Sequence, residues 1–173
     1  MGIKGLWTAL ARVAVISSFK ELITAEALER RLNGDELPII GVDASPLMFA
    51  AKFATKKKGE SINSWTRIGR ETELANLRKN LEQWLTLPAI VLVVFDGPRR
   101  PKMKRGKQVR TSRPHQLEPA FREMVEAMGF YCETAPGEAE AHLAMLNQSG
   151  AVDYILTSDN DAFVFGARNV IRL

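Results

Sequence analysis

The sequence predicts an α/β protein whose central, mostly parallel sheet is flanked by helices. Short apolar segments alternate along the chain with longer segments in which apolar residues recur at the helical period. The clearest strand, 89–95, is apolar throughout, as expected where helices cover both faces of a sheet. The 173 residues, 46% of them hydrophobic, suffice for one domain with a proper core. We therefore expect one domain over residues 1–173.

Five short segments are expected to form the sheet. Turn-forming residues or the end of a helical pattern bound each of them. Because strands and helices alternate, neighbouring strands should run parallel. In chain order the expected strands are 38–43, 89–95, 130–133, 153–157 and 169–173.

Six segments are expected to be helical. Thr24 is interpreted as the N-cap of the second, and Asn33-Gly34-Asp35 breaks it. Ser45-Pro46 starts the third with a cap and a proline in its first turn, and a loop at 56–59 follows. Pro136-Gly137 turns into the last helix. In order, the helical segments are 6–13, 24–32, one from Ser45, one within 65–87, 117–128 and 138–147.

Acidic residues follow three of the strands or open a helix, and they are the strongest functional signal. In open parallel sheets, ligands bind outside the carboxyl ends of the strands. Carboxylates gathered there repel each other unless cations lie between them. Hard carboxylate oxygens suit Mg²⁺ or Mn²⁺. The six candidate metal ligands are Asp43, Asp96, Glu138, Glu140, Asp159 and Asp161.

Each acid taken singly has a structural explanation. Asp43 and Asp159 are plausible N-caps, because an Asp after a strand and before a helix often caps that helix. Asp96-Gly97-Pro98 is a good turn. Only the convergence of all six acids at one edge favours a metal centre.

The spacing of the two glutamates requires an irregular helix start. Residues two apart on an ideal helix point to nearly opposite faces, so Glu138 and Glu140 reach one site only from a distorted first turn or through water. His142 would share the face of Glu138, and we favour packing or hydrogen bonding over ligation for it. His115 is assigned to the basic segment described next.

Positive charge is concentrated in one basic segment, residues 99–113. It contains eight basic residues and no acidic one, while the remaining sixteen basic and twenty acidic residues give a net charge of −4. A local patch of this density attracts a phosphate backbone. A solvated loop or a nuclear import signal is the alternative for a basic run alone. The eight residues are Arg99, Arg100, Lys102, Lys104, Arg105, Lys107, Arg110 and Arg113.

Several protein classes are disfavoured. The longest apolar run, 89–95, is far shorter than the ~20 residues of a membrane span. The single cysteine, Cys132, excludes an internal disulfide and fits a reducing, intracellular compartment. No nucleophile motif or phosphate-binding glycine loop is present. The chemistry that remains is metal-assisted hydrolysis of a phosphodiester.

The motifs together resemble the flap endonuclease/XPG family of structure-specific 5′ nucleases, whose core is a PIN-like domain. The N-terminus, Met1–Trp7, is similar to that of the family. The sequence that follows Asp96 is similar to that of fungal XPG-like proteins. Four acidic motifs match in order: Val42-Asp43-Ala44-Ser45, Val94-Phe95-Asp96-Gly97-Pro98, Ala135-Pro136-Gly137-Glu138-Ala139-Glu140-Ala141 and Thr157-Ser158-Asp159-Asn160-Asp161-Ala162-Phe163.

The resemblance implies roles for individual residues. The six acids match the family's ligands for two Mg²⁺ ions, which Mn²⁺ can replace. Lys104 matches the catalytic lysine, although one extra residue separates it from Asp96, and either Arg110 or Arg113 matches the catalytic arginine. Phe49 stands where a base-stacking tyrosine is found. The expected DNA contacts are Gly2, Phe49, Arg99, Arg100, Lys102, Arg105 and Lys107.

The resemblance also implies a function and competing possibilities. We expect a nuclear, monomeric, Mg²⁺-dependent endonuclease that cuts DNA at single-strand/double-strand junctions (a 5′ flap, bubble or four-way junction) and leaves a 5′-phosphate. The segment between Asp96 and Glu138 is shorter than in flap endonucleases, so a reduced helical arch is expected. The family's last metal aspartate and its helix–two-turn–helix clamp have no match in residues 1–173. A catalytically impaired DNA-binding scaffold and a PIN-type ribonuclease are the alternatives, and Asp43 argues against a Toprim-like domain.

Overall fold

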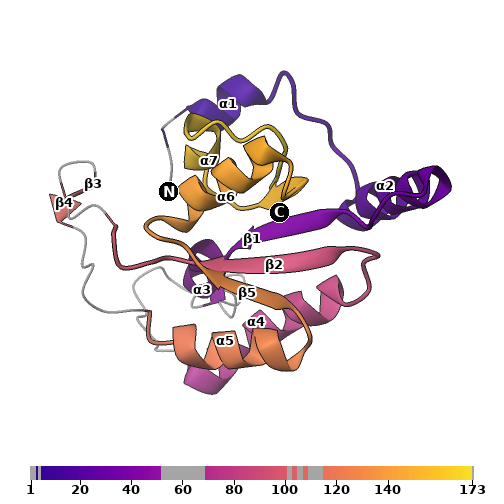
Figure 1. The fold of residues 1–173 in the computed structure, drawn as a ribbon. Coiled ribbons are helices and arrows are strands. Elements are labelled where there is room, and N and C mark those ends of the chain that lie inside the picture. The colour runs from indigo at the N-terminus through magenta and orange to yellow at the C-terminus, as the bar shows by residue number, and fades with distance from the viewer. Residues whose placement is uncertain are drawn as a thin grey trace, which may run out of the picture.

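Two layers of helices enclose a parallel sheet of five strands (Figure 1). The computed structural model describes residues 3, 5–51, 69–100, 103–104, 107–108 and 115–172. The strand order is β5-β2-β1-β6-β7, and every pairing in this sheet is parallel. The five strands are β1 (Ile39–Asp43), β2 (Ile90–Phe95), β5 (Tyr131–Thr134), β6 (Tyr154–Leu156) and β7 (Val170–Ile171).

The predicted α/β class and all five predicted strands are confirmed. The last strand, β7, is shorter than expected because only Val170 and Ile171 pair with β6. Two further strands, β3 (Met103–Lys104) and β4 (Lys107–Gln108), form a separate antiparallel pair within the basic segment. This pair lies apart from the main sheet, at the left of Figure 1. The predicted loop at 56–59 lies outside the described residues.

Helices connect the strands, and two of their predicted starts are wrong. The helix expected from Thr24 begins five residues earlier, because the Ser18 side chain caps it by accepting the backbone N–H of Glu21. Thr24 lies inside this helix, where its hydroxyl donates to the carbonyl of Lys20. The helices are α1 (Leu6–Leu10), α2 (Phe19–Asn33), α3 (Ala44–Ala51), α4 (Arg70–Trp84), α5 (Glu118–Ala127), α6 (Ala139–Ser149) and α7 (Asp161–Val164).

The second wrong start concerns α3. This helix begins at Ala44, not at Ser45, because the Asp43 carboxylate accepts the backbone N–H of Ser45 at 3.1 Å. Pro46 still falls in the first turn, where its missing N–H costs nothing. Ser45 is therefore a helical residue whose side chain is available for another contact.

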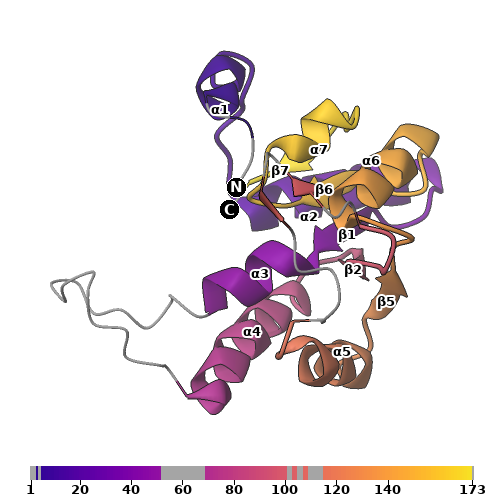
Figure 2. The same ribbon diagram turned by 90° about the vertical axis from the view of Figure 1, so that its left-hand side faces the viewer.

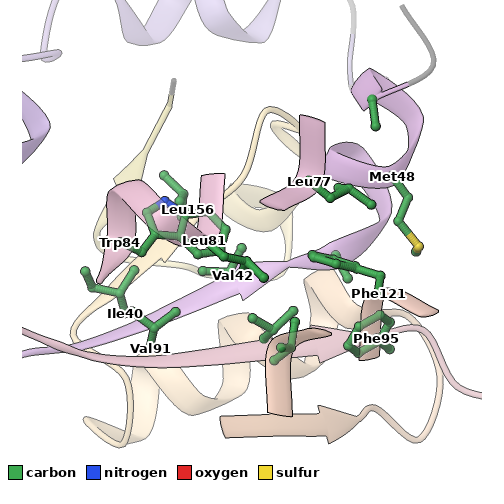
Figure 3. Packing of buried hydrophobic residues seen from close by; sticks show 14 of the residues in the cluster. Ile40, Val42, Met48, Leu77, Leu81, Trp84, Val91, Phe95, Phe121 and Leu156 are labelled. Carbon is green, nitrogen blue, oxygen red and sulfur yellow. The ribbon is translucent and has the colours of Figure 1, made fainter. Parts of the chain in front are cut away.

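The side chains of the central strands alternate between two hydrophobic clusters. Val91, Val93 and Phe95 of β2 belong to the cluster that packs α3, α4 and α5 against one face (Figures 2 and 3). Val94 belongs to the second cluster, which packs α6 and α7 against the other face. Both faces are thus covered, as the apolar β2 sequence predicts. No helix among the described ranges is long and apolar enough to cross a membrane.

Candidate metal centre

The topology brings the predicted acids to one edge of the sheet. Strand β1 lies between β2 and β6, and all three run in the same direction. Asp43 is the last residue of β1, and Asp96 directly follows β2. Asp159 comes three residues after β6. The carboxyl ends of three adjacent parallel strands therefore carry the acids, as the position rule for such sheets expects.

Asp43 is the most deeply buried of these acids, with 1% of its surface exposed. Its carboxylate accepts hydrogen bonds from the backbone N–H of Ser45 (3.1 Å) and from the hydroxyl of Thr157 (3.3 Å). Burial raises the pKa of Asp43 well above its ordinary value, and the negative charges of Glu140 and Asp96 raise this pKa further. The carboxylates of Asp96 and Glu140 therefore repel the buried carboxylate of Asp43.

Asp96 is held by donors from three different parts of the chain. Its Oδ2 accepts the hydroxyl of Ser45 at 2.6 Å and Nη1 of Arg100 at 3.0 Å. Its Oδ1 accepts the backbone N–H of Ala139 at 2.9 Å, at the first residue of α6. These contacts fix the carboxylate between α3 and the start of α6.

Glu140, Asp159 and Asp161 form the tightest carboxylate group. Each offers an oxygen that lies within 4.8 Å of the others. Asp159 and Asp161 are 3% and 7% exposed, and Oδ1 of Asp159 accepts the backbone N–H of Asp161 at 3.2 Å. Glu140 belongs to this group and also acts electrostatically on Asp43. It therefore links the acids after β6 to those after β1 and β2.

The two glutamates lie at the start of α6, one just outside the helix and one inside it. Glu138 is the N-cap of α6 and has extended backbone angles (φ −77°, ψ 134°), while Glu140 lies in the first helical turn. Glu138 is partly buried. His142 contacts Glu133 through Nε2 at 2.8 Å, which confirms that it is a hydrogen-bond partner.

The donor set fits a divalent cation. Buried carboxylate oxygens are hard ligands. A bound Mg²⁺ or Mn²⁺ would offset the burial and the repulsion that raise the Asp43 pKa. The charges of Glu140 and Asp96 act on Asp43. Carboxylate oxygens of Glu140, Asp159 and Asp161 lie within 4.8 Å of one another. Among the described residues, Glu138 is not part of the 4.8 Å group.

The predicted basic and aromatic contacts are described only in part. Arg99 is exposed, and Arg100 pairs with Asp96. Phe49 of α3 is 54% exposed, so its predicted stacking on a base stays a prediction. Lys104 and Lys107 are register partners in the β3–β4 pair. The remaining candidates lie outside the described residues: Gly2, Lys102, Arg105, Arg110 and Arg113.

Two uncharged residues that support the acids, and one that holds the amino-terminal segment, were not singled out for these roles from sequence. Ser45 binds two acids, Asp43 through its N–H and Asp96 through its hydroxyl. Thr157 donates to Asp43, and its hydroxyl accepts the backbone N–H of Asp159 at 3.1 Å. The buried amide of Asn160 holds the backbone of Ile3 through both its oxygen and its nitrogen. The signal in the sequence that could have indicated these roles is that all three residues lie inside the acidic motifs.

The parallel sheet with acids at its carboxyl edge has the predicted PIN-like fold. The fold matches the Holliday junction-resolving enzyme GEN1 in complex with product DNA and Mg²⁺, with a TM-score of 0.71 and 24% identity over 99% of this chain and 36% of that one. It also matches the catalytic core of Rad2 in complex with DNA substrate, with a TM-score of 0.71 and 24% identity over 99% of this chain and 50% of that one.

Sequence comparison finds similar proteins over parts of the chain. Residues 129–173 match the XPG I-region. Over 50 residues the chain is 54% identical to the flap endonuclease GEN homolog 1 of Mus musculus, covering 29% of this chain and 6% of that protein. Over 142 residues it is 28% identical to the Holliday junction resolvase YEN1 of Saccharomyces cerevisiae, covering 63% of this chain and 18% of that protein. The chain resembles the XPG/flap endonuclease family and spans less than a fifth of these two relatives.

Proposed function

We propose that residues 1–173 form the nuclease domain of a structure-specific DNA endonuclease. The observation that carries the proposal is the convergence of acids from β1, β2, α6 and the segment after β6 at one edge of the sheet. The matched GEN1 and Rad2 structures contain DNA, and that of GEN1 contains Mg²⁺. The substrate class that we assign is DNA with a single-strand/double-strand junction, and the site of action is the nucleus.

The cofactor that suits these acids is Mg²⁺, with Mn²⁺ as a substitute. We assign two ions to the six acids named above, because five of them form two groups that share Glu140. One group is Asp43, Asp96 and Glu140, and the other is Glu140, Asp159 and Asp161. When bound, divalent cations neutralise phosphate charge and lower the barrier to phosphodiester hydrolysis. Carboxylates without such cations would repel the substrate.

The protein's own residues orient these ligands. Ser45 holds Asp96 and Asp43 at a set separation, because its hydroxyl and its backbone N–H donate to one acid each. The Thr157 hydroxyl donates to Asp43 and accepts the backbone N–H of Asp159, so it fixes both. Ligand carboxylates that are themselves hydrogen-bonded bind cations in a preset geometry. Lys104 and one of Arg110 and Arg113 are proposed to stabilise the charge that develops on the phosphate.

Nucleic-acid binding is assigned to the basic segment. Its eight cations precede α5 and begin four residues after β2 ends, so the segment starts beside Asp96. Local positive charge of this density binds a phosphate backbone without sequence preference. Phe49 and Gly2 are proposed as further contacts to DNA ends, and the domain is proposed to act as a monomer.

A cleavage assay tests the proposal. Labelled 5′-flap, bubble, four-way junction and RNA substrates are incubated with Mg²⁺ and wild-type protein, Asp96→Asn or Asp35→Asn. Asp35 is an exposed acid after α2 and serves as the matched control. We expect junction-containing DNA to be cut by wild type and by Asp35→Asn, and Asp96→Asn to lose at least ~100-fold in rate.

Other outcomes would point elsewhere. Cleavage of RNA in preference to every DNA substrate would favour a ribonuclease. Tight DNA binding by the wild type with no cleavage in Mg²⁺ or Mn²⁺ would favour a scaffold. An Asp96→Asn variant as active as Asp35→Asn would remove the acidic centre from the mechanism.

A further inference from the structure

Arg100 places a positive charge directly on a candidate metal ligand. Its Nη1 lies 3.0 Å from Oδ2 of Asp96, and the two side chains are 21% and 17% exposed. Oδ2 also accepts the Ser45 hydroxyl, and Oδ1 accepts the backbone N–H of Ala139. The guanidinium therefore supplies the positive charge at Asp96 in this structure. A divalent cation at Asp96 would supply the same compensation, so the two positive charges would compete.

The pairing of Arg100 is incomplete. Its Nε is buried and has no hydrogen-bond partner in the described part of the chain. Buried donors are almost always hydrogen-bonded, so an unpaired one needs an explanation. A guanidinium presents its N–H groups as a planar fork that matches the oxygens of a phosphate. The free donor on Arg100 is the kind of group that a phosphate oxygen would satisfy.

Hydrogen bonds fix the backbone just before Arg100. A change of partner therefore needs only a rotation of its side chain. The N–H of Gly97 donates to the carbonyl of Gly137 at 2.7 Å, and the N–H of Arg99 donates to the carbonyl of Pro136 at 3.1 Å. These two bonds tie the segment after β2 to the turn before α6. Arginine rotamers change without disturbing such a backbone.

We propose that Arg100 is an exchangeable counter-ion of Asp96. In the metal-free protein it neutralises this carboxylate. When a divalent cation binds, the guanidinium leaves Asp96 and donates to a phosphate oxygen of the bound DNA. The inference rests on the proposed function, because it needs Asp96 to be a metal ligand and DNA to be the substrate. It follows that cation and DNA binding are coupled, since each releases or engages the same side chain.

The neighbouring Arg99 gives a matched control. It is exposed, carries the same charge and precedes Arg100 directly. Mg²⁺ affinity is measured by calorimetry without DNA for wild type, Arg100→Gln and Arg99→Gln. The loss of one partly exposed ion pair changes an equilibrium constant by about fivefold, so Arg100→Gln should bind Mg²⁺ about fivefold more tightly. Arg99→Gln should stay within about twofold of wild type, because it removes only a screened, more distant charge.

DNA binding gives the second arm. Flap DNA is titrated with Ca²⁺ in place of Mg²⁺, and Arg100→Gln should lose more affinity than Arg99→Gln, by about fivefold. The Nε–H signal of Arg100 in a nitrogen-15 spectrum, assigned by its loss in Arg100→Lys, should move on adding Mg²⁺ and again on adding DNA. Arg100→Lys keeps the charge but not the fork, so it should hold Mg²⁺ affinity near wild type and lose DNA affinity. Circular dichroism melts verify that each variant is folded.

Two failures are distinguishable. If wild type binds Mg²⁺ and Asp96→Asn weakens that binding, but Arg100→Gln and Arg99→Gln behave alike, the counter-ion role is wrong and the metal centre stands. If wild type binds no divalent cation, the proposed function itself fails. Should Arg100→Gln be unfolded, Arg100→Lys decides: DNA affinity equal to wild type, with an Nε–H signal insensitive to Mg²⁺ in the wild type, overturns the inference.

Discussion

The hydroxyl of Ser45 lies 2.6 Å from Oδ2 of Asp96, although 51 residues separate the two in the chain. The contact joins the first turn of α3 to the end of β2. The backbone N–H of the same serine binds Asp43, so one residue spaces two acids that repel each other. Supporting hydrogen bonds of this kind set the direction in which a carboxylate presents its free lone pairs.

Replacing Ser45 by alanine should weaken metal binding more than it weakens the fold. The Asp96 carboxylate would lose one donor and its preset direction, so Mg²⁺ affinity should fall about tenfold. The free energy of unfolding should fall by about 1 kcal/mol, the usual net value of one hydrogen bond. Calorimetric titration and urea unfolding measure the two effects. Ser45→Thr keeps the hydroxyl and should restore affinity; an alanine variant with wild-type affinity would refute the role.

Replacing Gly97 by alanine should disrupt the junction between β2 and α6. A Cβ at this position would lie 1.7 Å from the carbonyl oxygen of Ala135, which is backbone and cannot move aside. We expect a loss of about 3 kcal/mol or more in the free energy of unfolding.

Gly69→Ala is the matched control for this substitution. A Cβ at Gly69 meets nothing within 4 Å, and the residue caps α4 with ordinary backbone angles. Its stability should change by less than about 1 kcal/mol. Urea unfolding of both variants makes the comparison, and equal stabilities would contradict the close approach at Gly97.

Asp43 should make the metal-free protein less stable as pH rises. Burial and the charges of Glu140 and Asp96 raise its folded-state pKa well above the ordinary 3.8. The folded protein therefore holds this proton more tightly than the unfolded chain. Its contribution to stability is fully present below the unfolded pKa and is lost as pH rises through the raised folded pKa. Asp43→Asn should remove this loss and melt higher than wild type at pH 7 in a chelator.

Thermal melts between pH 4 and 8 with EDTA test this expectation. Adding Mg²⁺ at pH 7 should raise the melting temperature of wild type more than that of Asp43→Asn, because ligand binding to the native state stabilises it. A wild-type melting temperature that rises steadily from pH 4 to 8 in EDTA, with Asp43→Asn following it in parallel, would contradict the expected direction of this pH dependence.

Asn160 should anchor the amino-terminal segment to the acidic centre. Its amide binds both the N–H and the carbonyl of Ile3, and it lies between Asp159 and Asp161. A second contact supports the anchor, since the Trp7 ring meets the Phe163 ring edge-on at 5.9 Å between centroids. Asn160→Ala should lower the free energy of unfolding by about 1–2 kcal/mol and speed hydrogen exchange at Ile3.

The aspartate variant separates geometry from charge at the same position. Asn160→Asp keeps the acceptor for the Ile3 N–H but adds a negative charge among buried acids. It should be less stable than Asn160→Ala in EDTA and should regain part of the difference in Mg²⁺. If the two variants respond equally to Mg²⁺, Asn160 does not lie within the field of the metal centre.

Much of the fold could be predicted because local signals agreed with it. The apolar run 89–95, the break at Gly34 and the turn at Pro136-Gly137 all mark element boundaries, and the structure confirms them. Two boundaries were wrong where two polar residues competed to cap a helix. Ser18 outcompetes Thr24, and Asp43 outcompetes Ser45, because the winning side chain reaches an otherwise unpaired N–H of the first turn.

The sequence by itself determined which residues are candidates for the chemistry. Six carboxylates follow strands or open a helix, and the carboxyl ends of parallel strands meet at one edge of the sheet. Only the tertiary structure decided how they are held. Ser45 on Asp96 and Thr157 on Asp43 are contacts between side chains from distant parts of the chain. Their partners depend on register and on the packing of α3 and α6 against the sheet, and no local propensity encodes that information.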